Sequence, residues 1–141
     1  MGENERYKRG RISLILMVLL LSSACGIVQF KSGTITITNA FTTSGIDSSG
    51  QPLAPATEFH TKTSRIYCIV SVDSPSLVPV GVRWFFENEL FYDQVIRTDR
   101  SAPLAMFIEP LPGESFPVGS YRAEVYLVKE AVRVLDFIVV P

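Results

Sequence analysis

Short segments in which polar and apolar residues alternate most constrain the fold of this chain. Residues 34–38 read Thr-Ile-Thr-Ile-Thr, so every second side chain is apolar, as in a strand with one buried face. Pro, Gly and Ser separate segments of this kind, at intervals of about ten residues. No stretch after Cys25 has helical periodicity over about ten residues or more. The segments with strand character are residues 34–38, 65–72, 80–87, 90–97, 104–108, 121–128 and 132–140.

These segments predict an all-β fold, a single antiparallel β-sandwich of about seven or eight strands over residues 33–141. Residues 42–57 are expected to form a long loop with a turn at residues 47–50, and residues 87–89 a hairpin turn. Alternation directs every second side chain of a strand towards the interior, where Trp84 is expected to be the largest packing element. The predicted structural core residues are Cys68, Trp84, Phe86, Tyr121 and Phe137.

The N-terminal residues have a different pattern. A basic segment, residues 6–11, precedes an apolar run at residues 12–21, and small residues follow at 22–26. These are the three parts of a secretory signal. About ten residues of helix rise about 15 Å, half of a bilayer's hydrocarbon core, so the apolar run alone spans a membrane poorly.

Residues 20–25, Leu-Leu-Ser-Ser-Ala-Cys, resemble the lipobox of bacterial lipoproteins. The resemblance implies a signal peptide over residues 1–24 that forms a signal helix, cleavage before Cys25, and lipidation of Cys25. Residues 25–32 would then be a lipid-anchored tether. The protein would be extracytoplasmic and membrane-anchored in the bacterial cell envelope. An uncleaved signal-anchor extending to Val28 and a free secreted protein are the alternatives.

Residues 82–90 and 117–127, followed by residues 136–139, are similar to a β-sandwich module found at the C-terminal ends of bacterial extracytoplasmic proteins. Such modules resemble immunoglobulin-like and fibronectin type III domains. The resemblance therefore implies an immunoglobulin-like β-sandwich in an exported setting. It implies no catalytic activity.

Charge and composition narrow the classes of ligand. The chain has 13 Lys+Arg against 14 Asp+Glu, a net charge of −1, which argues against nucleic-acid binding. One His and two Cys leave little material for a metal site, so we expect no metal and no cofactor. Cys68 is expected to be a buried free thiol. The alternative, a disulfide between Cys68 and Cys25, can form only if Cys25 is not lipidated.

Few residues have the pattern of a catalytic site. His60 has no accompanying nucleophile signature, so we expect an exposed, non-catalytic histidine. Two carboxylate pairs could provide an acid and a base for glycoside hydrolysis. They are Glu87 with Glu89 and Asp93 with Asp99. Carboxylates near a hairpin tip are more typical of a solvated sheet edge, so we expect no catalytic residue and no enzyme.

Aromatic residues that alternate away from the predicted core are the best candidates for a binding surface. Phe85 opposes Trp84 along its strand, and Tyr126 likewise opposes its apolar neighbours. The candidate interaction surface consists of Phe85, Tyr92, Tyr126 and Tyr67. On one shared sheet they could stack on sugars or bind a protein; if another segment covers them, they contribute to internal packing.

The expected function is therefore that of a non-enzymatic, lipid-anchored β-sandwich that binds an unidentified extracytoplasmic protein or glycan. The expected partners are the membrane, through the N-terminal lipid, and this protein or glycan, but no nucleic acid. Two alternatives remain: a structural accessory subunit of an envelope complex and a secreted carbohydrate-binding module.

Overall fold

The computed structural model describes residues 35–98, 103–128 and 130–141. The predicted signal peptide, its helix, Cys25 and the tether lie outside the described residues. None of the described residues belongs to a helix long and apolar enough to cross a lipid bilayer. The described strands are β1 (Thr36–Thr43), β2 (Glu58–His60), β3 (Ile66–Asp73), β4 (Val78–Phe86), β5 (Glu89–Thr98), β6 (Leu104–Ile108), β7 (Gly119–Leu127) and β8 (Glu130–Val140).

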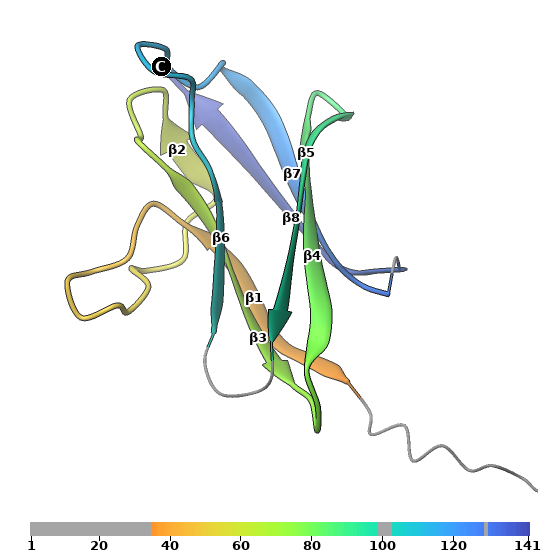
Figure 1. Cartoon of the computed structure of the whole chain (residues 1–141). Helices are drawn as coiled ribbons and strands as arrows, with labels where there is room; N and C mark the ends of the chain where they lie inside the picture. Colours follow the sequence, from red (N-terminus) through yellow and green to blue (C-terminus); the bar gives the residue numbers. More distant parts are fainter. Residues whose placement is uncertain (1–34, 99–102, 129) are drawn as a thin grey trace, which may run out of the picture. The chain divides into compact units, whose positions relative to one another are not determined.

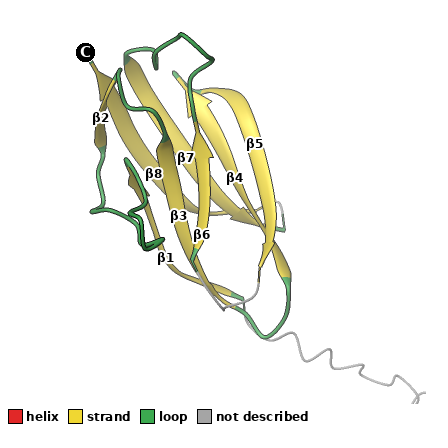
Figure 2. Cartoon of the chain, turned by 60° about the vertical axis from the view of Figure 1, so that its left-hand side comes forward, coloured by secondary structure: helices red, strands yellow, loops and turns green. Residues whose placement is uncertain are grey.

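The strands form two sheets, a three-stranded one with the order β1-β3-β6 and a five-stranded one with the order β2-β8-β7-β4-β5 (Figure 1). Figure 2 shows β2 and β5 at opposite edges of the five-stranded sheet. The predicted all-β sandwich is confirmed. The prediction of a purely antiparallel sandwich is wrong, because β2 pairs with β8 in parallel.

The parallel pair arises where the chain crosses between the sheets. After β1, residues 44–57 carry the chain from the three-stranded sheet to the free edge of β8. There the Ile138 N–H donates a hydrogen bond to the Thr57 carbonyl, with an N···O distance of 3.0 Å. The Phe59 ring packs edge-on against Phe137, and Phe59 is almost completely buried. One buried aromatic side chain thus anchors a strand of three residues.

The core lies between the two sheets. Cys68 and Trp84 have no exposed surface, and Tyr121 and Phe137 are also buried. Phe86 is half-buried and packs on Tyr121, with a ring-centroid distance of 4.8 Å. The aliphatic residues that surround them include Ile66, Val70, Met106, Val80, Val82 and Val125. The side chains that alternation directs inward are therefore the ones that pack together.

Tyr121 lies at the centre of an aromatic cluster. Its ring stacks on Phe137 with a centroid distance of 5.2 Å and an interplanar angle of 15°. The other rings that contact it are Phe86, Phe91 and Phe116. The Tyr121 hydroxyl donates a hydrogen bond to the Pro117 carbonyl at 2.9 Å. Burial raises the pKa of Tyr121 to about 12 because it disfavours the charged phenolate.

Both predicted turns are present. Asp47 Oδ1 accepts hydrogen bonds from the Ser49 side chain and from the backbone N–H groups of Ser49 and Gln51, and these bonds lower the pKa of Asp47. In the β4–β5 hairpin, Glu87 and Asn88 have φ angles of 48° and 71°. Positive φ at both central residues is the requirement of a two-residue type I′ turn, which matches the twist of the flanking strands.

The buried thiol of Cys68 predicts a loss of stability in alkaline solution. Desolvation raises the pKa of Cys68 from 9.0 to about 12, so the unfolded chain loses this proton before the folded chain does. The contribution of the protonated Cys68 thiol to the free energy of unfolding is complete below about pH 9. It declines by up to about 1.4 kcal/mol per pH unit until about pH 12.

We expect urea unfolding to show that, between about pH 9 and pH 10, the free energy of unfolding falls by about 1 kcal/mol more in the wild type than in Cys68→Ala. This comparison isolates the thiol, because tyrosines and lysines titrate in both proteins. Equal pH dependence in the two proteins would contradict the assignment.

Candidate functional site

The structure separates the four aromatic residues of the predicted interaction surface. Phe85 and Tyr126 lie on the outer face of the five-stranded sheet, on β4 and β7. Tyr92 pairs with Trp84, so its side chain is on the inner face of β5. Tyr67 lies on β3 in the other sheet. Only Phe85 and Tyr126 therefore share a face.

Tyr126 is covered by side chains of its own sheet. Its ring lies across β4 over Gly81, and its hydroxyl donates a 2.7 Å hydrogen bond to Asp93 Oδ1 on β5. The Arg83 guanidinium stacks on the ring, 4.3 Å from its centroid. Tyr126 is consequently 8% exposed. Desolvation, followed by the hydrogen bond to Asp93 and its charge, raises the pKa of Tyr126.

Phe85 is covered in the same way by Arg122 on β7. The guanidinium lies 4.4 Å from the centroid of the Phe85 ring. Arg122 also donates a hydrogen bond to Asn88 Oδ1 at 3.1 Å, and its Nε forms an ion pair with Glu124 without a hydrogen bond. An arginine thus occupies one ring face of each outer aromatic residue. The arrangement therefore covers one ring face of Phe85 and one ring face of Tyr126.

The close approach of Tyr126 to Gly81 gives a stability prediction. A methyl group at residue 81 would overlap the Tyr126 ring. We expect Gly81→Ala to lower the free energy of unfolding by about 1–3 kcal/mol, because the ring must leave Asp93 and Arg83. Urea denaturation of Gly81→Ala, Tyr126→Ala and the double variant provides the measurement. In the Tyr126→Ala background the cost of Gly81→Ala should vanish, and an unchanged cost would contradict the packing explanation.

Three of the residues considered for chemistry, His60, Glu87 and Asp93, have separate contacts. His60 is exposed, and its Nδ1 is 2.9 Å from the Pro141 carbonyl oxygen. Glu87 accepts a hydrogen bond from the Ser120 N–H, and Asp93 is bound to Tyr126. Asp99 lies outside the described residues. Within residues 35–98, 103–128 and 130–141, no three His, Cys, Asp or Glu side chains converge as metal ligands.

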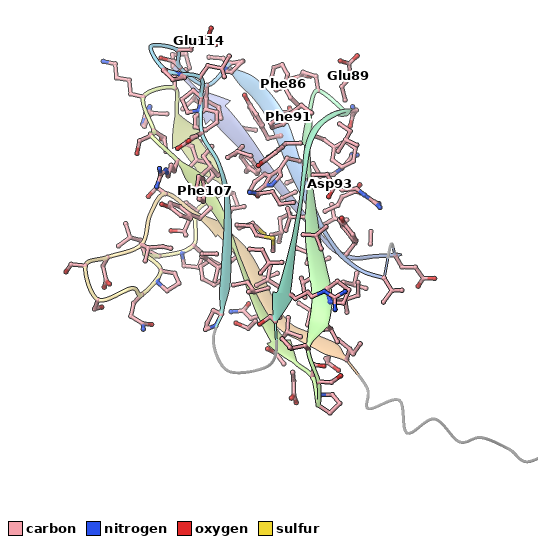
Figure 3. All side chains as sticks on the ribbon, in the orientation of Figure 1. Phe86, Glu89, Phe91, Asp93, Phe107 and Glu114 are labelled. Carbon is pink, nitrogen blue, oxygen red and sulfur yellow. The ribbon has the colours of Figure 1, made fainter. Side chains whose placement is uncertain are left out.

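β5 is a candidate interaction site, of which the predicted interaction surface included only Tyr92. It is a ten-residue strand at the edge of the five-stranded sheet, paired only with β4 among the described strands. Figure 3 shows Glu89 at the tip of the β4–β5 hairpin, with Phe91 and Asp93 further along the strand. Its exposed large apolar residues are Leu90 (54%), Phe91 (50%), Tyr92 (47%), Val95 (57%) and Ile96 (38%).

These apolar side chains occupy both faces of β5. Val95 pairs with Gly81 and lies on the outer face, whereas Tyr92 and Ile96 pair with inward residues of β4. A long, apolar edge strand is a template for pairing with another chain, and proteins usually protect such edges with Lys, Pro or bulges. β5 contains neither Lys nor Pro, and its bulge lies near its start, between Leu90 and Tyr92. The apolar runs at residues 90–92 and 95–96, which break the alternation, are the sequence signal for this site.

Comparison with known proteins identifies the fold. The chain is similar to the crystal structure of an immunoglobulin-like protein from Pseudomonas aeruginosa, with a TM-score of 0.58 and 13% sequence identity. The match covers 78% of this chain and 99% of that chain. No protein-family model and no curated protein matches the sequence. The described sandwich therefore has an immunoglobulin-like fold.

Two side-chain features typical of immunoglobulin sandwiches are present. Trp84 is buried on a central strand, and the Tyr121 hydroxyl reaches back to the backbone four residues earlier. In antibody domains a cysteine follows this tyrosine by two residues and forms the disulfide between the sheets. That position is Ala123 here, and Cys68 is a free thiol.

Proposed function

We propose that this protein is a non-enzymatic, lipid-anchored immunoglobulin-like module of the bacterial cell envelope that binds a protein partner along β5. The observation that supports binding is the exposed apolar edge of β5, at residues 89–98. An edge strand offers a row of backbone N–H and C=O groups to another extended chain, and the neighbouring side chains add specificity.

The outer face of the sheet favours a protein partner over a glycan. Sugar binding by stacking needs an aromatic ring with an open face. Arg83 stacks on Tyr126, and Arg122 stacks on Phe85. The apolar residues of β5 are instead arranged along an unpaired backbone, which is a feature that a peptide strand can use and a sugar cannot.

The lipid anchor is proposed from the sequence. The basic segment, the apolar run and Cys25 support an extracytoplasmic protein held at the membrane by acyl chains. Each buried methylene contributes about 0.8 kcal/mol, so two or three chains hold a protein stably. Tethering also raises the effective concentration of β5 towards other proteins at the same surface.

Mass spectrometry of the mature N-terminus tests the anchor. We expect a chain that begins at Cys25 and carries the mass of the acyl groups, in the membrane fraction. Cys25→Ser should lose that mass, while Cys68→Ala should retain it, because the Cys68 thiol is buried in the core. An unmodified Cys25 in the wild-type protein would contradict the proposal.

Chemical cross-linking in intact cells tests the binding surface. Val95→Arg places a charge on β5, and Val134→Arg places one on β8 at a position of similar exposure, 54% against 57%. We expect the wild type and Val134→Arg to be captured with the same partner and Val95→Arg to lose it. Capture of that partner by Val95→Arg at the wild-type level would exclude β5 as the contact.

A further inference from the structure

We propose that the partner of β5 is β5 of a second copy of this chain, paired antiparallel about a two-fold axis at Val95. The pairing would join two five-stranded sheets into one continuous sheet. This inference rests on the proposed function, in which β5 is the interaction strand, and it names the partner.

The backbone of β5 suits such pairing better than that of the other edge strands. β5 has ten residues, whereas β1, β6 and β2 have eight, five and three. Its only register shift against β4 lies between Tyr92 and Leu90. From Tyr92 to Thr98 the register is regular, and from Tyr92 to Arg97 β4 is the only described strand that pairs with β5. This segment, residues 92–97, is therefore a regular template for pairing.

The sequence of this segment is self-complementary. When Val95 faces Val95 of the second copy, Asp93 faces Arg97 of that copy, and Arg97 faces its Asp93. The three side chains lie on the outer face, because they pair with Arg83, Gly81 and Pro79 of β4. Two opposite-charge pairs thus flank one apolar pair. On the inner face, Tyr92 and Ile96 would lie opposite Thr98 and Gln94 of the second copy.

Other symmetric registers are less favourable. A pair centred on Asp93 or on Arg97 would place like charges directly opposite each other. A pair centred on Gln94 or Ile96 would place Asp93 or Arg97 opposite Val95. Only the register centred on Val95 matches both charges. The charge pattern therefore selects one alignment of two copies.

The two charged groups are able to bind a new partner. Asp93 Oδ1 is occupied by the Tyr126 hydroxyl, but Oδ2 is 3.9 Å from Arg83 Nε, which is too long for a hydrogen bond. The Asp93 side chain is 45% exposed. Arg97 is exposed and has no acidic partner among the described residues. The guanidinium of one copy can therefore reach the Asp93 carboxylate oxygen of the other copy that accepts no hydrogen bond.

Disulfide cross-linking of Val95→Cys in the full-length protein, in its membrane, tests this register. Under mild oxidation, we expect most of the chain to migrate at twice its monomer mass on a non-reducing gel and to return to the monomer on reduction. Val134→Cys is the matched control, with similar exposure on β8, and should stay monomeric. Cys68 contributes nothing, because it is buried. Adding Arg97→Glu to Val95→Cys should abolish the dimer, because a carboxylate at residue 97 would face Asp93 of the second copy.

Three results would overturn the inference. Equal dimer formation by Val134→Cys would indicate random collision. Disulfide capture of a different envelope protein by Val95→Cys, without a self-dimer, would leave the proposed binding strand in place but exclude a second copy as its partner. A Val95→Cys protein that is folded by circular dichroism, with no adduct of any kind, would exclude both this pairing and β5 as the binding strand.

Discussion

Trp84→Ala is expected to lower the free energy of unfolding by about 3–5 kcal/mol. Trp84 has no exposed surface and lies on β4, between β7 and β5. Its ring contacts Phe137 edge-on, and its indole N–H donates a 3.1 Å hydrogen bond to Gln94. Removal of the indole leaves a large cavity and leaves the side-chain amide oxygen of Gln94 without its hydrogen-bond donor. Domains of this size have a total stability of about 5–15 kcal/mol, so the variant would be close to unfolding at about 25 °C.

Urea denaturation followed by far-ultraviolet circular dichroism measures this loss, because the variant has no tryptophan fluorescence. Val134→Ala is a suitable control, since Val134 is half exposed on β8, and its change should stay within about 0.5 kcal/mol. A loss below about 1 kcal/mol for Trp84→Ala would show that the indole is not the main packing element of the core.

The second large effect is expected at Tyr121. Tyr121→Ala removes the ring that stacks on Phe137 and contacts three further aromatic residues, at a cost of about 3–5 kcal/mol. Tyr121→Phe keeps these contacts and loses only the hydrogen bond to Pro117, at a cost of about 0.5–1.5 kcal/mol. Thermal and urea unfolding of both variants separates the ring from the hydroxyl.

Tyr92→Ala deletes the same side chain from the same sheet and serves as the matched control. Tyr92 is 47% exposed on the edge strand, so the loss should be no more than about 1 kcal/mol. If Tyr121→Ala and Tyr92→Ala had equal effects, the aromatic cluster around Tyr121 would not contribute to stability as its burial indicates.

Alternation predicted most of the fold because it has a direct physical cause. In β3, β4 and β7, one face packs against the opposite sheet, and every second residue must be apolar. The inward sets that include Cys68, Trp84 and Tyr121 could therefore be read from the sequence. Gly, Pro and Ser marked the chain reversals between these strands, because those residues suit turn conformations.

The errors occur where alternation is interrupted or too short. β1 extends to Thr43, whereas the predicted strand ends at residue 38. The prediction ended too early because a bulge between Ile37 and Asn39 reverses the alternation of polar and apolar residues. β2 has only three residues, and its pairing with β8 depends on residues far away in the sequence. A local pattern cannot report such a non-local partner.

The binding surface was harder to predict than the fold for a related reason. Alternation correctly separates Phe85 from Trp84, but it does not show that Arg122 of another strand will cover the Phe85 ring. Tyr92 lies next to a bulge in β5, and the register with β4 places it beside Trp84. The order of strands in a sheet decides which one is at the edge, and this order is a property of the whole topology.

The place where the chain enters the sandwich determines where the two entry points would lie in such a pair. Thr36 pairs with Asp73, next to the short connection to β4, and β4 starts beside Thr98, so the entry point lies at the end where β5 finishes. In antiparallel β5 strands centred on Val95, Thr98 of one copy faces Tyr92 of the other, so the two entry ends would lie about six residues, or about 20 Å, apart along the strands. The two entry points would then lie near the middle of the pair, and the two β4–β5 hairpins would lie at its two ends.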